Sequence, residues 1–281
     1  MKRLVVNADD YGQSLGTNQA ILKAHHQGIL TSTSCMANMP AIEAGAAELS
    51  DAPKLGLGAH ISLNVGSPVL SPTQLPALVD EQGLFHGSYL THIRLSRRPD
   101  YLAQAELEIE AQIQRLLQLG YSLDHINGQS HLQMIPGLHR LFVAAALRHS
   151  LWLRNSKERA FGHPRTVCVN LLKNGLINQL SRLDQTSDKV EFFGIRMSGQ
   201  MDRKTLLYYL KNNQSPITEL LSHPAQGTED PGYPLQPFVK AWLREPGREQ
   251  ELQGLIDPKV KAAVAENGFV LCTFKEAFAT A

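Results

Sequence analysis

The 281-residue sequence has few of the features that mark secreted, membrane-bound or redox proteins. It holds only three cysteines, Cys35, Cys168 and Cys272, and no C-x-x-C pair, so we expect reduced, mostly buried thiols and no cysteine-based zinc or redox site. No apolar run approaches the ~20 residues of a membrane span. Met1-Lys2-Arg3 leads into a strand candidate without a leader-type segment, and we therefore expect a cytoplasmic chain.

An excess of charge is missing as well. The chain has 27 Lys and Arg against 26 Asp and Glu, a formal net charge of +1. This balance provides no broad electrostatic field for nucleic acid or for an anionic membrane. Aromatic residues make up 6% of the chain, so few rings are available to stack on a ligand. The composition favours a small neutral or mixed-polarity ligand.

Apolar runs of strand length alternate with helical periodicity along the chain, which is typical of repeated βα units. No G-x-G-x-x-G or G-x-x-x-x-G-K-[ST] motif follows a strand, which disfavours an open nucleotide-binding sheet. We therefore predict a single α/β domain over residues 1–281 with a TIM-like (β/α) barrel, a fold of ~250 residues. The strand candidates are 3–7, 31–38, 55–63, 123–131, 151–154, 190–197, 218–223 and 269–273, and the helix candidates are 17–27, 41–49, 101–119, 137–148, 202–212 and 258–267.

Two long segments interrupt this alternation, 64–98 and 224–236. Both are rich in loop-forming residues such as Gly and Pro, and both follow strand candidates directly. Loops of this length in a compact domain are usually lids, binding loops or locally disordered segments. We expect both to lie near a site at the carboxyl ends of the strands.

Asp9 and Asp10 stand together at the end of the first apolar run, just before Gly12. A strand that ends in this way delivers both carboxylates to the rim of the sheet. Two adjacent carboxylates usually need a cation or strong hydrogen-bond donors nearby to stay ionised at neutral pH. The pair is therefore a candidate for metal binding or catalysis. The alternative is a cap on the helix predicted at 17–27.

Histidines mark the ends of further strand candidates. His60 lies in a glycine-rich apolar strand, where a lone histidine is often a buried core residue. His223 ends the strand at 218–223, just before the second long loop. In a parallel barrel these strand ends lie on the same rim as Asp9 and Asp10.

The strand predicted at 123–131 carries alternating polar residues. Side chains two apart share a face, so one face would hold His125, Asn127, Gln129 and His131. Unpaired in a dry core, each would cost roughly 1–3 kcal/mol. The face therefore lines a wet or charged site, or forms a hydrogen-bonded ladder.

The strand ends thus present Asp, His, His and His, a donor set that suits Zn²⁺ and other first-row divalent ions. Such an ion lowers the pKa of bound water and polarises a carbonyl group, which suits hydrolysis of an amide or an ester. The remaining Asp and His can then move protons.

These motifs resemble those of the YdjC-like carbohydrate deacetylases, which include chitooligosaccharide deacetylases and the hopanoid-associated HpnK proteins. The similar segments cover nearly the whole chain in order: 7–12, 28–34 with Asn38, 56–63, 125–136 and 223–224. The resemblance implies an irregular (β/α) barrel and a homodimer. It also implies a metal-dependent hydrolase that removes acetyl groups from a small-molecule N-acetylated sugar.

Carried onto this sequence, the resemblance makes Asp9 the general base and His223 the general acid. It implies that one divalent metal ion, Mg²⁺ or Zn²⁺, binds Asp10, His60 and a third residue at the position of Gln129 or His131. The candidates for contacts with the sugar are Tyr11, Asn38 and Asn127.

Two residues depart from the family pattern Asp-x-His-x-His, which here reads Asn127-Gly128-Gln129-Ser130-His131. An amide oxygen is a poorer ligand than imidazole for a borderline ion. Three outcomes stay open: His131 supplies the third bond, Gln129 binds a harder ion such as Mg²⁺, or the metal site is lost. In the last case the chain would be a degenerate carbohydrate-binding protein on the same scaffold. Hydrolysis of another amide, ester or phosphate is a further hypothesis, and the lack of a basic cluster disfavours phosphate.

Overall fold

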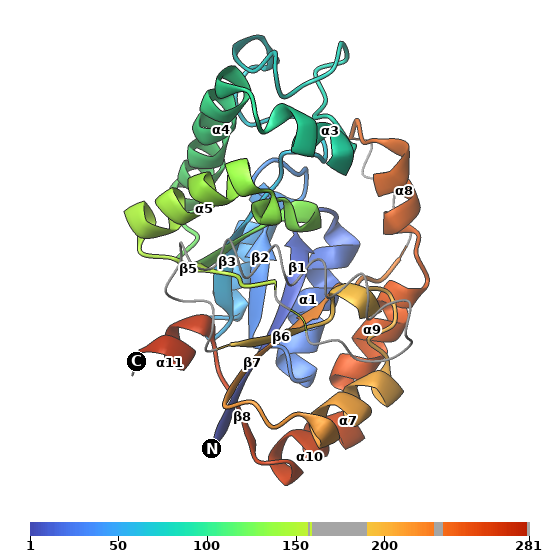
Figure 1. Ribbon diagram of the computed structural model, residues 1–281. Helices are drawn as coiled ribbons and strands as arrows, with labels where there is room; N and C mark the ends of the chain where they lie inside the picture. The colour runs from blue at the N-terminus through green and yellow to red at the C-terminus, as the bar shows by residue number, and fades with distance from the viewer. Residues whose placement is uncertain (157, 159–189, 228–232, 280–281) are drawn as a thin grey trace.

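The computed structural model describes residues 1–156, 158, 190–227 and 233–279, and these form one parallel β-sheet surrounded by helices (Figure 1). The sheet has eight strands in the order β5-β4-β3-β2-β1-β7-β6, and β8 pairs with β1. Its strands are β1 Lys2–Tyr11, β2 Ser32–Cys35, β3 Gly56–Ile61, β4 Leu123–Gly128, β5 Trp152–Leu153, β6 Glu191–Phe193, β7 Ile217–Ser222 and β8 Phe269–Leu271. All eight overlap the predicted strands.

β1 is the central strand of this sheet. Its first residues pair with β8, its middle pairs with β7, and its last residues from Asn7 to Tyr11 pair with β2. Every residue from Leu4 to Tyr11 is buried, as expected for a parallel strand that is covered on both faces. The carboxyl end of β1, with Asp9 and Asp10, therefore lies inside the protein.

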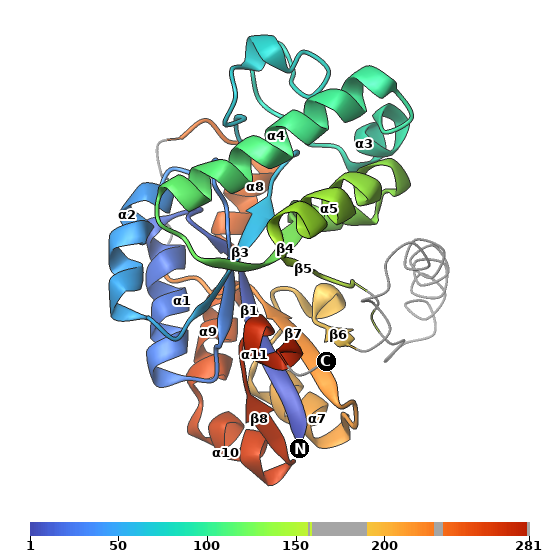
Figure 2. The same cartoon turned by 90° about the vertical axis from the view of Figure 1, so that its left-hand side faces the viewer.

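The predicted closed barrel is confirmed only in part. The sheet curls into a half-barrel, and α1, α4 and α5 lie around its outside (Figure 2). Within the described residues β5 and β6 are not paired as strands, although a single parallel bridge joins Glu158 to Phe192. The architecture is an α/β fold with a curled parallel sheet.

In the described part of the chain, the helices match the six predicted ones, and four further helices are present. The predicted helices are α1 Leu15–Gln27, α2 Ile42–Glu48, α4 Pro99–Gln118, α5 Pro136–His149, α7 Arg203–Asn212 and α10 Pro258–Glu266. The other four are not among the predicted helices: α3 Tyr89–Leu95, α8 Pro237–Leu243, α9 Gly247–Ile256 and α11 Phe274–Phe278. Three of these four have seven residues or fewer, so their periodicity is too short to read from the sequence.

The strand predicted at 123–131 is shorter than expected. β4 ends at Gly128, and the chain continues as a 3₁₀ segment over Gln129–Met134 in which Ser130 and His131 have φ values of 53° and 56°. Alternation therefore stops at Gly128. The prediction that His131 shares a strand face with Asn127 is wrong, because these left-handed residues turn the chain out of the sheet.

The segment 64–98 is partly ordered by contacts with α4. Glu108, which is buried, accepts hydrogen bonds from the backbone N–H groups of Val69 (2.8 Å) and Leu70 (3.1 Å), and from Gln112 (2.8 Å). Gln104 of α4 also accepts from the backbone N–H of Ala77 at 2.7 Å, so two α4 side chains bind the first half of this segment.

The second long loop leads into α8, which packs against the start of the first long loop. Of this loop the structure describes residues 224–227 and 233–236. A small apolar cluster brings α8 against the segments that follow β2 and β3; its members are Met36, Met39, Val65, Leu235, Val239 and Leu243. This packing positions Trp242 of α8 near the end of β1.

The described cysteines are reduced and buried, as predicted from the sequence. Cys35 and Cys272 are buried and free, and Cys168 lies outside the described residues. No helix in the described part of the chain combines the length and the apolar character that a membrane crossing requires.

Replacement of Glu108 by Ala should destabilise the protein. It would leave two backbone N–H groups and Gln112 without their acceptor, at a cost of about 1–3 kcal/mol in the free energy of unfolding. Urea denaturation measures this loss. Glu106→Ala on the same helix is the control, because Glu106 is half exposed and forms a surface ion pair with Arg148 at 3.4 Å. Equal effects of the two substitutions would contradict the role of Glu108.

Candidate active site

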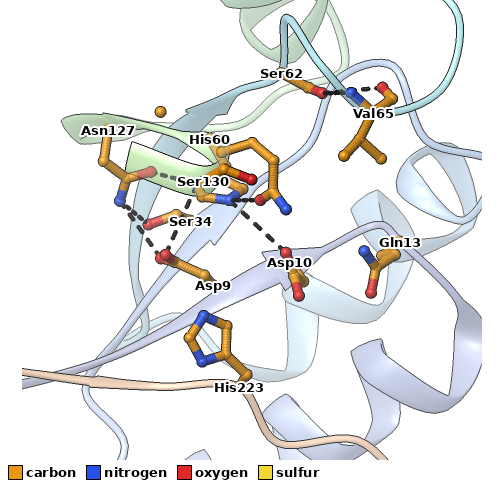
Figure 3. Close-up of polar contacts among 12 residues, drawn as sticks. Asp9, Asp10, Gln13, Ser34, His60, Ser62, Val65, Asn127, Ser130 and His223 are labelled. Atoms are coloured by element: carbon orange, nitrogen blue, oxygen red, sulfur yellow. Dashed lines mark hydrogen bonds and ion pairs between the residues drawn. The ribbon is translucent and has the colours of Figure 1, made fainter. Parts of the chain in front are cut away.

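Polar side chains from four strands meet at the carboxyl edge of the sheet. Asp9 and Asp10 come from β1, His60 from β3 and Asn127 from β4, and His223 follows β7 directly (Figure 3). The sequence analysis predicted this meeting from the parallel strands. The structure brings all five side chains to one place.

Asp9 is buried and accepts several hydrogen bonds. Its carboxylate accepts hydrogen bonds from both terminal nitrogens of Arg154, at 2.6 Å and 2.8 Å, and from the side-chain amide of Asn7 at 2.9 Å. Burial alone would raise the pKa of Asp9, but the charge and hydrogen bonds of Arg154, with His60 and His223, lower it well below the usual range. Asp9 is therefore ionised at neutral pH.

Arg154 also binds a second buried carboxylate. Its Nε donates to Glu219 of β7 at 2.6 Å, so one guanidinium lies between two acids. Burial raises the pKa of Glu219 to about 7, and the nearby charge of Asp9 contributes to the increase, while Arg154 opposes it. Arg154 thus links β1 to β7 through ion pairs with Asp9 and Glu219.

Asp10 has a different environment. Its φ of 76° lies in the left-handed region and turns the side chain away from that of Asp9. Its Oδ2 accepts from Trp242 Nε1 at 3.1 Å and from Arg248 at 3.3 Å. Its Oδ1 is buried and has no hydrogen-bond partner among the described residues. One oxygen of Asp10 is therefore available to a ligand.

His60 lies between these acids and β4. Its Nε2 is 3.7 Å from the free Oδ1 of Asp10 and 2.5 Å from the side-chain oxygen of Gln129. Its Nδ1 contacts Asn127 Oδ1 and is 3.9 Å from Asp9. A free carboxylate oxygen, an imidazole nitrogen and an amide oxygen thus converge.

Of the two candidates for the third metal ligand, the structure brings Gln129 to His60. The turn after Gly128 sends His131 elsewhere, and its Nδ1 lies 3.3 Å from Ser156 Oγ. Gln129 remains close to β3 because it directly follows the strand end.

The three converging donors fit a divalent cation. Oxygen and imidazole donors suit Mg²⁺, Zn²⁺ and related ions, and the buried Asp10 Oδ1 has no hydrogen-bond partner among the described residues. Among the described residues, no group of three or more His, Cys, Asp or Glu side chains is arranged to hold a metal ion. Any such site here would have to use the amide of Gln129.

His223 is positioned by its backbone. Its N–H donates to buried Glu251 at 2.5 Å, and its carbonyl accepts from Arg248 at 3.0 Å. The ring packs edge-on against Trp242, and its buried Nδ1 has no hydrogen-bond partner in the described part of the chain. This imidazole therefore has a nitrogen to offer a ligand.

Two predicted substrate contacts lie outside this group. Tyr11 is fully buried in the main core, and its hydroxyl donates to Gly45 O at 2.9 Å. Asn38 donates to the carbonyls of Val65 and Ser67 and thereby shapes the loop after β3. The Asn38 side-chain oxygen is buried and finds no partner within the described residues.

Four residues of the site were missed in the sequence analysis: Arg154, Glu219, Trp242 and Arg248. All four contact an acid of the site or its partner. Arg154 stood at the end of a predicted strand, and the rule that two adjacent carboxylates need cations could have directed attention to it. Trp242 and Arg248 belong to helices without a readable pattern.

Comparison with known proteins places this geometry in context. Residues 3–266 match the model of a protein family that is described as YdjC-like protein. The carbohydrate deacetylase of Thermoanaerobacter pseudethanolicus is 30% identical over 277 residues, which cover 98% of each chain. The chitooligosaccharide deacetylase of Proteus mirabilis is 30% identical over 278 residues, with 97% of this chain and 98% of the relative covered.

A solved structure shows the same fold. A protein of Enterococcus faecalis V583 that is named for cellobiose-phosphate cleavage superimposes with a TM-score of 0.73, covers 98% of each chain and is 23% identical.

The raised pKa of Glu219 predicts a pH-dependent stability. Folded Glu219 keeps its proton up to about pH 7, whereas an unperturbed glutamate releases it near pH 4.5. The native state then holds more protons between these values, so this group makes the protein less stable as the pH rises. Relative to the wild type, Glu219→Gln should gain free energy of unfolding between pH 4.5 and pH 7.

Urea denaturation at several pH values measures this difference. Glu106→Gln, on the surface, should show none. A difference between Glu219→Gln and the wild type that stays constant over the range would contradict the assigned pKa.

Proposed function

Because the chain belongs to the YdjC-like protein family, as its motifs predicted, we propose that it is a metal-dependent carbohydrate deacetylase that hydrolyses the amide bond of N-acetylated sugars. One observation carries the proposal: an ionised carboxylate, Asp9, stands beside three converging donor atoms, Asp10 Oδ1, His60 Nε2 and Gln129 Oε1. The named relatives support the substrate class, and the ordered strand ends support the chemistry.

A divalent metal ion would be held by Asp10 Oδ1, His60 Nε2 and Gln129 Oε1. When bound, it would polarise the acetyl carbonyl and lower the pKa of the attacking water. Trp242 and Arg248 hold the other oxygen of Asp10 and so direct Oδ1 toward His60. The amide ligand favours a hard ion such as Mg²⁺ more than an imidazole would.

Asp9 acts as the general base. Arg154 keeps it ionised and fixes its orientation with two hydrogen bonds, one to each carboxylate oxygen, and the bond to Oδ2 comes from Nη1. A carboxylate oxygen can accept a second hydrogen bond. Oδ2 therefore takes the proton of the water whose oxygen attacks the carbonyl carbon.

His223 acts as the general acid. The bond between carbon and nitrogen breaks when the amine nitrogen receives a proton, and the imidazole of His223 has a partnerless Nδ1 near Asp9. Glu251 and Arg248 fix its backbone, and Trp242 fixes its ring. The products are acetate and a free amino sugar.

A second candidate function is sugar binding without hydrolysis. The observation in its favour is the hydrogen-bond distance between Gln129 and His60, a contact that needs no metal. On this reading the site would bind an N-acetylated sugar and release no acetate.

Acetate release from N-acetylglucosamine oligosaccharides separates the two functions. Asp9→Asn should lower kcat by about 10²–10⁴-fold, because the amide cannot take a proton from water. Asp100→Asn is the control, since this exposed carboxylate forms its ion pair with Arg98 on the surface. If the Mg²⁺- and Zn²⁺-loaded wild type releases no acetate from the sugars it binds, the second function is correct.

The third ligand can be tested independently. Gln129→His should tighten Zn²⁺ binding at least ~10-fold in calorimetric titration, because imidazole is the better ligand for this ion. The matched control His131→Gln should leave the affinity unchanged, since His131 turns away from His60. Loss of binding in His131→Gln, with no gain in Gln129→His, would place the third ligand at His131.

A further inference from the structure

Gln13 is a buried side chain of the site that has no part in the mechanism described above. It lies in the turn after β1, and its backbone N–H donates to the carbonyl of Asp10 at 3.0 Å. Its side chain is fully buried and lies beside that of Asp10, with its amide end on the side of the Asp10 carboxylate (Figure 3). A polar amide is thus fixed next to a candidate metal ligand.

The orientation of this amide follows from its contact with Arg248. Arg248 Nη1 donates to Gln13 Oε1 at 2.8 Å. A guanidinium group has only donors, so the atom of Gln13 that faces it must be the oxygen. The other end of the amide is therefore the NH₂ group. Its nitrogen, Nε2, is buried and has no hydrogen-bond partner among the described residues.

A buried NH₂ group without an acceptor is costly. The lost hydrogen bonds to water destabilise the folded state by about 1–3 kcal/mol, and nearly all buried polar groups in proteins have a partner. A cation accepts no hydrogen bond, so a metal ion at Asp10 leaves this NH₂ group unpaired. An oxygen atom of a bound ligand supplies the acceptor.

Arg248 holds Gln13 and Asp10 side by side. Its Nη2 donates to Asp10 Oδ2 at 3.3 Å, so the two terminal nitrogens of one guanidinium group bind the two side chains. The other oxygen of Asp10, Oδ1, lies 3.7 Å from His60 Nε2. The NH₂ group of Gln13 and Oδ1 of Asp10 are thus the free ends of two neighbouring side chains. A carbonyl group that binds at Asp10 comes next to the NH₂ group.

Arg248 also strengthens this donor. Buried hydrogen bonds in a chain polarise one another. A buried cation that donates to the amide oxygen of Gln13 draws electron density from the nitrogen, so the NH₂ group becomes more positive. Such a donor stabilises an oxygen atom more strongly as that atom gains negative charge. This polarity suits the oxygen of a reacting acetyl group better than a sugar hydroxyl.

We propose that Gln13 is a further catalytic residue, whose side-chain NH₂ group donates a hydrogen bond to the acetyl oxygen of the substrate. The inference rests on the proposed function, because only hydrolysis places negative charge on this oxygen. Arg248 is then a positioning residue for two groups, since it directs the free oxygen of Asp10 and the NH₂ group of Gln13.

The reaction gives this hydrogen bond its use. Asp9 takes one proton of the water, the water oxygen bonds to the carbonyl carbon, and the electron pair of the C=O double bond moves to the acetyl oxygen. Gln13 stabilises the resulting oxyanion and transfers no proton. The pair returns when the bond between carbon and nitrogen breaks and the nitrogen takes a proton from His223.

Gln13→Met and Gln13→Glu test the role of the NH₂ group. Both variants are unbranched and lack the NH₂ group, but only Gln13→Glu keeps an acceptor for Arg248. In acetate release from N-acetylglucosamine oligosaccharides, both should lower kcat by about 10²–10³-fold with little change in KM, because the lost hydrogen bond is strongest in the transition state. A wild-type kcat in either variant, or a change in KM alone, overturns the proposal.

Thr17→Val is the matched control. Thr17 is a second buried side chain that accepts from Arg248, at 3.5 Å, and its hydroxyl also pairs with Ser14. This variant should keep the wild-type kcat. Calorimetric titration with Zn²⁺ should give the same affinity in Gln13→Met as in the wild type, because Trp242 and Arg248 still hold Asp10. A loss of Zn²⁺ affinity would show that Gln13 acts only by supporting Asp10, and would overturn the proposal.

Infrared spectroscopy of the bound sugar tests the hydrogen bond without turnover. The N-acetylglucosamine dimer, ¹³C-labelled at the acetyl carbonyl, is bound to Asp9→Asn in the presence of Zn²⁺. A hydrogen bond lowers the stretching frequency of a carbonyl group, so the bound band should move to higher wavenumber when Gln13→Met is added. An unchanged band overturns the proposal.

The infrared result also separates this proposal from the proposed function. If the wild type binds the dimer but releases no acetate, the proposed function fails, and the band still shows whether Gln13 donates to the acetyl oxygen. If the wild type releases acetate and neither kcat nor the band changes in Gln13→Met, the role of Gln13 fails alone. A wild type that does not bind the dimer contradicts both.

Discussion

Asp9 and Asp10 are buried side by side, and the charge of each must be balanced inside the protein. Two buried arginines from distant parts of the chain do this: Arg154 binds Asp9 and Arg248 binds Asp10. Removing one partner of a buried ion pair typically costs 3–5 kcal/mol, so each arginine ties its own segment to the end of β1. The arrangement of the segment after β5 and of α9 follows from this constraint.

The two arginines bind their acids differently, and the difference separates the chemistry of the two carboxylates. Arg154 contacts both oxygens of Asp9 and keeps that carboxylate ionised and fixed, as a general base requires. Arg248 contacts one oxygen of Asp10 and leaves the other free beside His60. The two adjacent carboxylates thus have different environments, because the left-handed backbone at Asp10 directs them to different partners.

Much of this arrangement could be predicted from the sequence. Eight apolar runs gave the strands, and parallel pairing placed Asp9, Asp10, His60 and His223 at one edge. The path of Gln129 and His131 could not be predicted, because the turn after Gly128 depends on two left-handed residues that are not glycine, and the alternation of polar residues continued past it. The sequence also could not show whether the barrel closes, because periodicity identifies strands but does not show whether the first and last of them pair. Arg154 and Arg248 were missed because a buried arginine has no local signal.

The central claim is that Asp10, His60 and Gln129 together hold one divalent metal ion. The most direct measurement is an anomalous difference map at the zinc absorption edge from crystals grown with Zn²⁺. The claim predicts one strong peak between Asp10 Oδ1, His60 Nε2 and Gln129 Oε1. A map with no peak among these atoms, or a peak at His131 instead, would contradict it.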